Sequence, residues 1–233
     1  MTRQYPLDLR WPSHQRLDAF WPGANAAVLR DVSAVAGGEG DVWLYLHGAP
    51  GTGKSHLLIG ACRAALESNH AARYVSLVQL PAPRGEAIAG IEAPGLLAID
   101  DVQAIAGDRD AERALFGLYN RAKAAGAQAL FAANASPAEL GIGLPDLVSR
   151  LAMCTQHALR LPDDADRRAM LRLLAERLGL RLDDEVLDWW FVRQPRDPAS
   201  LVALLQRIDR AALAAQRRVT IPFLRELLHV SNA

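Results

Sequence analysis

Lysine is almost absent from this 233-residue chain. Of its 26 basic residues only Lys54 and Lys123 are lysines, and the others are arginines. The basic residues are balanced by 26 acidic ones, so the formal net charge is zero. Coating nucleic acid, or binding an anionic membrane by charge, requires a clear basic excess that this chain lacks. The composition therefore disfavours both of these classes of protein.

Cysteine and long apolar runs are scarce as well. Cys62 and Cys154 lie far apart, and neither belongs to a CxxC or Cys/His cluster, so neither a disulfide scaffold nor a zinc site is indicated. No run approaches the roughly 18 apolar residues of a membrane span, and the first ten residues lack the apolar stretch of a signal peptide. We expect a cytoplasmic protein with no membrane contact.

The residues that are present, 51% apolar and 22% charged, are typical of a globular protein. Short apolar runs alternate with helical patterns at 24–36, 55–68 and 111–125. Unbroken apolar strands that alternate with helices predict a parallel sheet covered on both faces, an α/β fold. The runs read as strands lie at 42–47, 74–77, 96–99, 129–132 and 158–161.

The character of the chain changes after Leu161. The sequence then predicts a small all-helical domain, because only a short run around Val219 interrupts the helical patterns. Asp163 and Asp164 are suited to cap the first of these helices, so we place a domain boundary near Pro162. The predicted organisation is a tail (1–13), an α/β domain (14–161) and a helical domain (162–233). The helices are expected at 163–178, 183–191, 198–216 and 221–230.

A phosphate-binding motif directly follows the strand at 42–47. Its sequence, G-x-x-x-x-G-K-S, stands between a strand and a helix, as the motif requires. Glycines let the backbone N–H groups face phosphate oxygens, Lys54 supplies a mobile positive charge, and Ser55 can ligate Mg²⁺. A chance glycine-rich turn is the weaker alternative. The residues are Gly48, Ala49, Pro50, Gly51, Thr52, Gly53, Lys54 and Ser55.

Polar residues follow two later strands. Asp100 and Asp101 end the strand at 96–99, where Asp100 can hold Mg²⁺ and Asp101 can orient or deprotonate an attacking water. Asn134 ends the next strand, and Arg150 follows a turn opened by Pro145. Taken alone, an acidic turn, a turn-forming asparagine and a solvated arginine are the simpler readings.

Together these elements resemble the AAA+ ATPases: Walker A at 48–55, Walker B at 96–101, a sensor at Asn134 and an arginine finger at Arg150, followed by an α-helical lid. The stretches Gly-Lys-Ser-His-Leu-Leu, Ile-Asp-Asp-Val-Gln-Ala-Ile-Ala-Gly and Leu-Pro-Asp-Leu-x-Ser-Arg-Leu are similar to the DnaA/Hda subfamily. The resemblance implies a three-layer P-loop NTPase sandwich that binds ATP or ADP with Mg²⁺. It also implies that His56 and an adenine pocket contributed by Phe20, Pro22 and Asn25 belong to the nucleotide site.

The resemblance further implies a role in replication initiation. The chain would stimulate hydrolysis of ATP bound to DnaA, with Arg150 acting in trans and with little hydrolysis of its own. The tail Gln4-Tyr5-Pro6-Leu7-Asp8-Leu9 is similar to the peptide by which this subfamily engages the DNA polymerase sliding clamp. Gln4 would provide paired hydrogen bonds, and Leu7 and Leu9 would enter an apolar cleft. DNA would then be reached only through the clamp.

One departure separates this chain from the subfamily pattern. The lid position of a second sensor arginine corresponds to Ala199, and Arg196 lies before the helix that Pro198 opens. Two alternatives stay open: a self-sufficient ATPase such as a motor or helicase loader, and a DNA-binding initiator-like protein. The sequence leaves open whether the chain is a monomer or a homodimer, and which nucleotide it holds.

Overall fold

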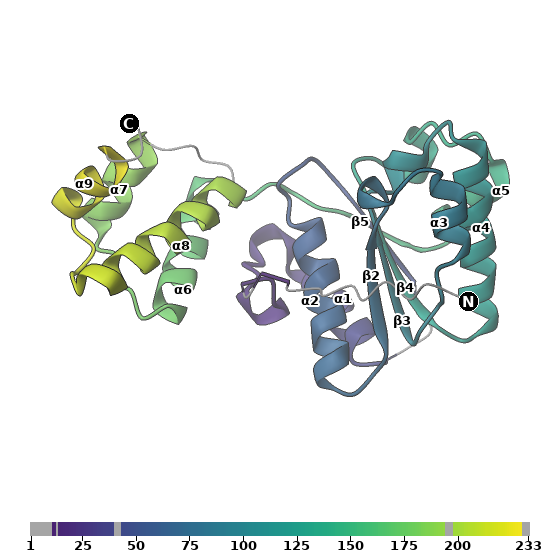
Figure 1. The fold of residues 1–233 in the computed structure, drawn as a ribbon, viewed down its shortest axis with the longest axis horizontal. Helices are drawn as coiled ribbons and strands as arrows, with labels where there is room; N and C mark the ends of the chain where they lie inside the picture. The colour runs from purple at the N-terminus through teal and green to yellow at the C-terminus, as the bar shows by residue number, and fades with distance from the viewer. Residues whose placement is uncertain (1–10, 13, 40–42, 194–197, 230–233) are drawn as a thin grey trace. The chain divides into compact units, whose positions relative to one another are not determined.

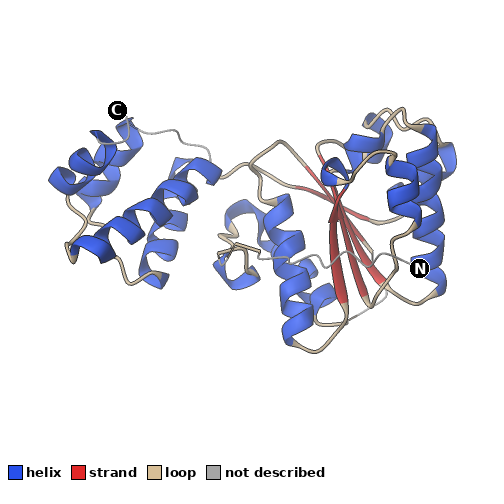
Figure 2. Cartoon of the chain, in the orientation of Figure 1, coloured by secondary structure: helices blue, strands red, loops and turns tan. Residues whose placement is uncertain are grey.

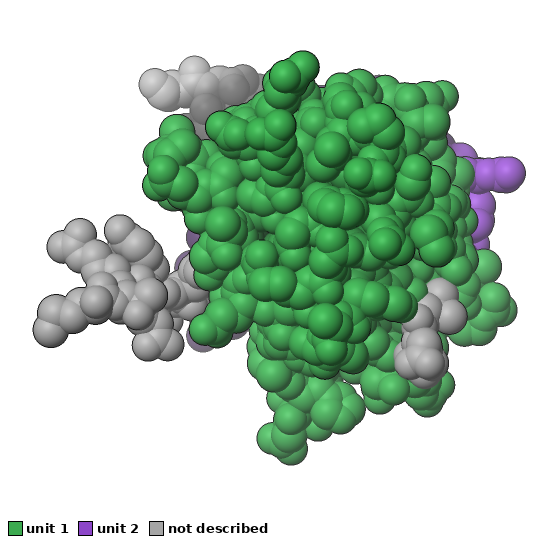
Figure 3. Space-filling view, turned by 90° about the vertical axis from the view of Figure 1, so that its right-hand side faces the viewer, with its two compact units in different colours: residues 1–20, 27–47, 54–158 green, residues 21–26, 48–53, 159–233 purple. Residues whose placement is uncertain are grey.

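The computed structural model describes residues 11–12, 14–39, 43–193 and 198–229. They fall into two compact units, coloured separately in Figure 3. The sequence places a boundary near Pro162, and the long segment of unit 2 begins at Leu159, but two short upstream segments also join that unit. Unit 1 comprises 1–20, 27–47 and 54–158, and unit 2 comprises 21–26, 48–53 and 159–233.

Unit 1 is built on a single sheet of five parallel strands, drawn in red in Figure 2. Their spatial order is β2-β3-β4-β1-β5, so β4 lies between the strand that precedes the phosphate-binding motif and the strand that ends in the two acids. The strands are β1 (Leu44–His47), β2 (Ala72–Ser76), β3 (Leu96–Asp100), β4 (Gln128–Ala133) and β5 (Thr155–Ala158).

Helices cover both faces of this sheet (Figure 1). One face carries α1 (Ala26–Ala36) and α2 (Lys54–Glu67), and the other carries α3 (Arg84–Ala89), α4 (Arg109–Ala124) and α5 (Pro145–Ala152). The prediction of a three-layer α/β sandwich is confirmed. Short 3-10 helices occupy Leu17–Ala19, Gly23–Asn25, Leu77–Gln79, Val102–Ile105 (η4) and Pro137–Glu139.

Alternate residues of the strands fill the layer between the sheet and α4. Trp43 packs edge-on against Tyr119 of α4, with ring centroids 4.5 Å apart, and its indole N–H donates to the carbonyl of Ala127 at 3.0 Å. Tyr45 and Phe131 belong to the same buried cluster. Because both faces of the sheet are covered, the intervening strand residues Leu44, Leu46 and Leu130 are buried as well.

The predicted strand at 158–161 is wrong. The fifth strand is Thr155–Ala158, and Leu159 to Leu161 follow it without strand structure. This strand pairs only with β1 at the edge of the sheet, and Thr155, Gln156 and Ala158 are exposed. The sequence of an exposed edge strand does not have to be apolar. The apolar run that predicted a strand at 158–161 therefore starts at the last residue of the actual strand and lies mostly after it.

The helical part of unit 2 contains four helices within the described residues: α6 (Asp164–Arg177), α7 (Asp184–Arg193), α8 (Pro198–Ala215) and α9 (Ile221–His229). Asp163 caps α6, accepting a hydrogen bond from the Asp166 backbone N–H at 2.8 Å. Trp190 of α7 is 1% exposed, and apolar residues of α8 and α9 such as Leu205 and Leu224 are buried as well. None of the described helices has the length and apolar character needed to cross a bilayer.

Candidate functional site at the carboxyl ends of the strands

The parallel register brings the functional residues of unit 1 to one edge of the sheet. His47 pairs with Ala133 between β1 and β4, and Ser76 pairs with Asp100 between β2 and β3. The strands therefore end at a common edge, where Asp100, Asp101 and Asn134 lie. This is the position at which open α/β sheets bind ligands.

The phosphate-binding motif is shared between the two units. Its loop, residues 48–53, belongs to unit 2, and α2 of unit 1 begins directly after it at Lys54. Gly51 and Gly53 have φ angles of +83° and +94°, a conformation that residues with a Cβ rarely adopt. Thr52 closes the turn, because its hydroxyl donates to the Ala49 carbonyl at 2.9 Å. The backbone requires the glycines that the motif predicts.

A cluster of oxygen atoms surrounds the end of β3. Asp100 is 1% exposed, and its carboxylate accepts hydrogen bonds from the Tyr74 hydroxyl at 2.9 Å and from Ser55. Burial raises the pKa of the Asp100 carboxyl, and the bonds from Ser55 and Tyr74 oppose that rise. Ser55 and Asp100, the two predicted magnesium ligands, are thus in direct contact, and both offer the hard oxygen atoms that Mg²⁺ prefers.

The charge of Lys54 balances these acids. Burial lowers the pKa of the Lys54 ammonium, and the nearby carboxylates of Asp100 and Asp101 oppose that shift. Within the described residues no group of three or more His, Cys, Asp or Glu side chains gathers to cage a metal. Mg²⁺ commonly binds through one or two protein oxygens together with phosphates and water, which this arrangement suits.

Asp101 has a left-handed backbone, with φ +59° and ψ +42°. Both of its carboxylate oxygens accept hydrogen bonds: one from the Ser76 hydroxyl at 2.8 Å, the other from the Gln103 amide at 3.2 Å. The Gln103 carbonyl oxygen in turn accepts the backbone N–H of Asn134 at 3.2 Å. Gln103 therefore links the second Walker B acid to the sensor position. Gln103 was not among the predicted site residues, although a polar amide two residues after the acids is a usable signal.

Arg150 lies in the last turn of α5, which Pro145 opens at its first position. The side chain is exposed, and no ion pair or hydrogen bond holds its guanidinium anywhere in the described part of the chain. Its only close partner is an aromatic ring: the Cζ atom lies 5.9 Å from the ring centroid of Tyr119 on α4. The guanidinium is therefore free to reach a second molecule.

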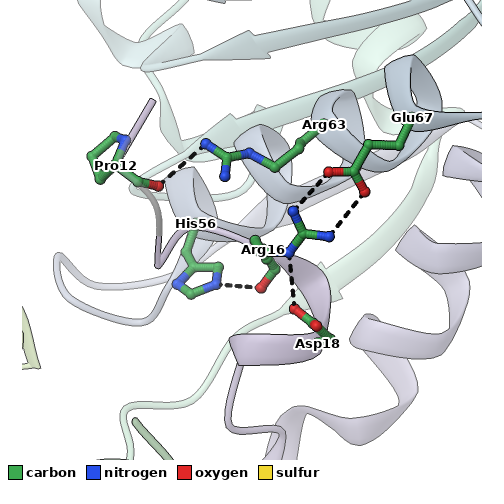
Figure 4. A network of polar contacts seen from close by, with 6 residues as sticks. All are labelled: Pro12, Arg16, Asp18, His56, Arg63 and Glu67. Atoms are coloured by element: carbon green, nitrogen blue, oxygen red, sulfur yellow. Dashed lines mark hydrogen bonds and ion pairs between the residues drawn. The ribbon is translucent and has the colours of Figure 1, made fainter. Parts of the chain in front are cut away.

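Residues 11–12 and 14–20 lie along α2 (Figure 4). Arg16 forms a two-bond ion pair with Glu67, at 2.7 and 2.9 Å, and Arg63 donates to the carbonyls of Trp11 and Pro12. His56, two residues after Lys54, donates from Nε2 to the Arg16 carbonyl at 2.8 Å. This network ties the segment before the expected adenine pocket to the helix that starts at the phosphate-binding motif.

The three predicted adenine-pocket residues divide between the units. Phe20, in unit 1, is 8% exposed and packs edge-on against the His56 ring at a centroid distance of 5.5 Å. Pro22 and Asn25 belong to unit 2, where the Asn25 carboxamide bonds both backbone groups of Arg160 at 2.9 Å. Trp21 was not among the predicted pocket residues. Its indole N–H donates to the carboxylate of Asp166 in α6 at 2.8 Å.

Comparison with known proteins adds two findings to this geometry. Residues 164–228 match a family model described as the lid domain of Hda. Domain III of the replication initiation protein DnaA from Thermotoga maritima has a similar fold, with a TM-score of 0.74 and 22% identity over 94% of this chain and 97% of that one. The chain therefore has the AAA+ fold of this DnaA domain, and its helical domain is similar to the lid of Hda.

Two further structures share the AAA+ fold. AMPPCP-bound DnaA from Aquifex aeolicus matches with a TM-score of 0.68 and 21% identity, over 84% of this chain and 65% of that one. The RuvB Holliday junction branch migration motor from Thermotoga maritima matches with a TM-score of 0.61 and 17% identity, over 88% of this chain and 68% of that one. This chain thus spans about two thirds of the length of either protein.

Two sequence expectations for this AAA+ chain concern the lid and the tail. Ala199 is the second residue of α8, the helix on which the sequence pattern expects a sensor arginine, and Arg196 lies outside the described residues. A Cβ on Gly51 would lie 3.6 Å from Cδ of Pro198, so within unit 2 the phosphate-binding loop approaches the start of this helix. The expected clamp-binding residues Gln4, Leu7 and Leu9 also lie outside the described residues.

Proposed function

We propose that this AAA+ protein binds ATP or ADP and regulates replication initiation by stimulating hydrolysis of ATP bound to DnaA. Nucleotide binding is supported by the glycine conformations of the loop, by Lys54, and by the contact between Ser55 and Asp100. A related DnaA was solved with a nucleotide analogue. Ser55 and Asp100 would hold a Mg²⁺ ion that accompanies the nucleotide, and the ion would supply positive charge beside the phosphates.

The observation that carries the proposal is the exposed guanidinium of Arg150. It lies near the end of a short helix that Pro145 starts, and no carboxylate in the described residues neutralises it. Supplied to the site of a partner, such an arginine stabilises the charge that develops on the transferred phosphoryl group. The match to the lid of Hda supports DnaA as that partner.

Two features support an activator over a self-sufficient ATPase. Ser76 and Gln103 each donate a hydrogen bond to one carboxylate oxygen of Asp101, so two protein donors already hold the residue expected to orient water. Ala199 stands where the lid would present a sensor arginine. The chain's own nucleotide therefore serves mainly to fix the geometry of the module, and its own hydrolysis is slow.

The tail completes the proposal. Gln4, Leu7 and Leu9 dock the protein on the sliding clamp, which brings it to DNA that carries the clamp. A chain of zero formal charge needs such an indirect route, because it has no basic excess with which to bind bare DNA.

The test is single-turnover hydrolysis of ATP bound in advance to DnaA, measured with and without this protein in the presence of clamp-loaded DNA. We expect acceleration that requires both this protein and the clamp. Turnover of free ATP by the isolated protein is measured in parallel. Rapid turnover there, with no effect on the ATP held by DnaA, would instead support an independent ATPase. Salt-sensitive binding to bare DNA would support an initiator-like protein.

A further inference from the structure

A buried carboxylate on α4 has no part in the nucleotide site described above. Glu112 lies in the first turn of α4 and is only 1% exposed. Glutamate is rarely buried to this extent without partners, because removing a carboxylate from water is costly. No lysine, arginine or histidine forms an ion pair with Glu112 in the part of the chain that the structure describes. Its stabilising partners must therefore be neutral donors.

Those partners are two backbone N–H groups from different loops. The Gly107 and Gly143 N–H groups donate to Oε1 of Glu112 at 2.9 and 3.0 Å. Gly143 also approaches the second oxygen closely, because a Cβ built on it would lie 3.5 Å from Oε2. One side chain thus fastens together two loops that are separated by more than thirty positions in the sequence.

The first loop leads back to the Walker B acids. Asp101 precedes η4 (Val102–Ile105), and Gly107 follows this short helix. The Asp101 network through Gln103 therefore fixes the start of η4, and Glu112 fixes the residue just beyond its end. One short 3-10 helix thus separates the residue at the end of β3 from the loop that Glu112 holds.

The second loop leads forward to Arg150. Gly143 precedes Leu144 and Pro145, the N-cap and first residue of α5. Arg150 lies five residues after Pro145, about 8 Å along the helix axis at 1.5 Å per residue. Helix α4 also reaches Arg150 directly, since the Arg150 Cζ lies 5.9 Å from the centroid of the Tyr119 ring. Glu112 and Tyr119 are seven residues apart and so share one face of α4.

We propose that Glu112 is a positioning residue for Arg150, connecting the segment that follows the Walker B acids to the loop that starts the finger helix. The inference rests on the proposed function, because it assigns to Arg150 the work of an arginine finger. Glu112 touches neither nucleotide nor partner. It acts by fixing the start of α5, so that the Arg150 guanidinium has one defined position and orientation.

Two substitutions of Glu112 distinguish its role as a hydrogen-bond acceptor from the effects of its side-chain size and its negative charge. Both bonds use Oε1, which Glu112→Gln retains, so this variant keeps both acceptor contacts without the charge. Glu112→Met has a similar length but no oxygen acceptor, and it leaves the two loops unfastened. Glu86, an exposed carboxylate on α3, provides the matched control Glu86→Met, which removes one acid from the same unit.

The assay is the stimulated hydrolysis of DnaA-bound ATP with clamp-loaded DNA, measured with the full chain at several concentrations. Since a misplacement of about 1 Å costs a reacting group about a hundredfold, we expect Glu112→Met to lower the maximal stimulated rate between about 10-fold and about 100-fold. The concentration that gives half-maximal stimulation and the protein's own affinity for ADP should stay unchanged. Glu112→Gln should retain most of the stimulation, and Glu86→Met all of it.

A Glu112→Met variant that stimulates as the parent does would overturn the proposal. Should Glu112→Met fail to fold, Gly143→Pro decides the matter, because it removes the Gly143 N–H that donates to Glu112; stimulation at the parent level would then refute the role.

Failure of the proposed function would give a different result from failure of the positioning role of Glu112. If the parent protein and Arg150→Ala stimulate equally, Arg150 is not a finger and the failure lies there. If Arg150→Ala is slow while the folded Glu112→Met and Gly143→Pro variants match the parent, only the positioning role is wrong.

Discussion

The carboxamide of Asn25 provides a quantitative test of how the expected adenine-pocket segment is held. Asn25 is 7% exposed; its Nδ2 donates to the Arg160 carbonyl and its Oδ1 accepts the Arg160 N–H, both at 2.9 Å. Asn25→Ala removes both bonds. At about 1 kcal/mol net for each, we expect the free energy of unfolding to fall by about 2 kcal/mol, a factor of about 30 in the equilibrium constant.

Asn25→Asp is the sharper perturbation. It keeps the size of the side chain and the acceptor for the Arg160 N–H, but it replaces the donor with an oxygen that faces the Arg160 carbonyl. We therefore expect Asn25→Asp to destabilise the protein at least as much as Asn25→Ala at neutral pH, although it retains one bond. A residue needed only for its bulk would give the opposite order.

The assay is urea unfolding followed by tryptophan fluorescence, with ADP affinity measured in parallel. Asn120→Ala, at an exposed position of α4, is the control and should change the free energy of unfolding by less than about 0.5 kcal/mol. The reasoning is refuted if Asn25→Ala matches Asn120→Ala, or if Asn25→Asp is as stable as the parent.

Two further predictions concern the segment before the pocket and the tail. Burial lowers the pKa of the His56 imidazole below its ordinary 6.5, so the unfolded chain takes up a proton at a higher pH than the folded chain does. This part of the stability is fully present above pH 6.5 and is lost as the pH falls below it. Melting temperatures at about pH 7.5 and about pH 5.5 should therefore differ less in His56→Gln than in the parent, and an equal difference would contradict this. Changing Gln4, Leu7 and Leu9 together to alanine should abolish binding to immobilised sliding clamp while leaving ADP affinity intact; undiminished clamp binding would reject the tail assignment.

Much of the nucleotide-binding layer could be predicted from the sequence, because its signals are local. A glycine-rich loop between an apolar strand and a helix specifies backbone conformation residue by residue, and Gly51 and Gly53 have positive φ angles in the structure. The run that ends in Asp100 is a buried central strand, whose composition follows from burial on both faces. Helix α4 also follows its pattern, with Asp108 as the N-cap and basic residues in the last turn.

The remaining features depend on contacts between distant segments. Strand β5 is polar and exposed, so no apolar run marks it. Gln103 gains its importance only when the ends of β3 and β4 lie side by side. The burial of Glu112 could have been predicted, because an acid at helical spacing from Leu115 and Tyr119 lies on the apolar face of α4. Which backbone groups satisfy it follows only from the folded loops at Gly107 and Gly143.

The central claim is that Arg150 acts in the active site of a partner, and one measurement tests it most directly. ATP is bound to DnaA in advance, clamp-loaded DNA is added, and single-turnover hydrolysis is followed with the parent protein, with Arg150→Ala, and with the control Arg113→Ala, which removes an equal charge from an exposed position of α4. Loss of an arginine finger costs about a thousandfold or more, so Arg150→Ala should return hydrolysis to the unstimulated rate while Arg113→Ala retains the full effect. Stimulation by Arg150→Ala at the parent level would contradict the account.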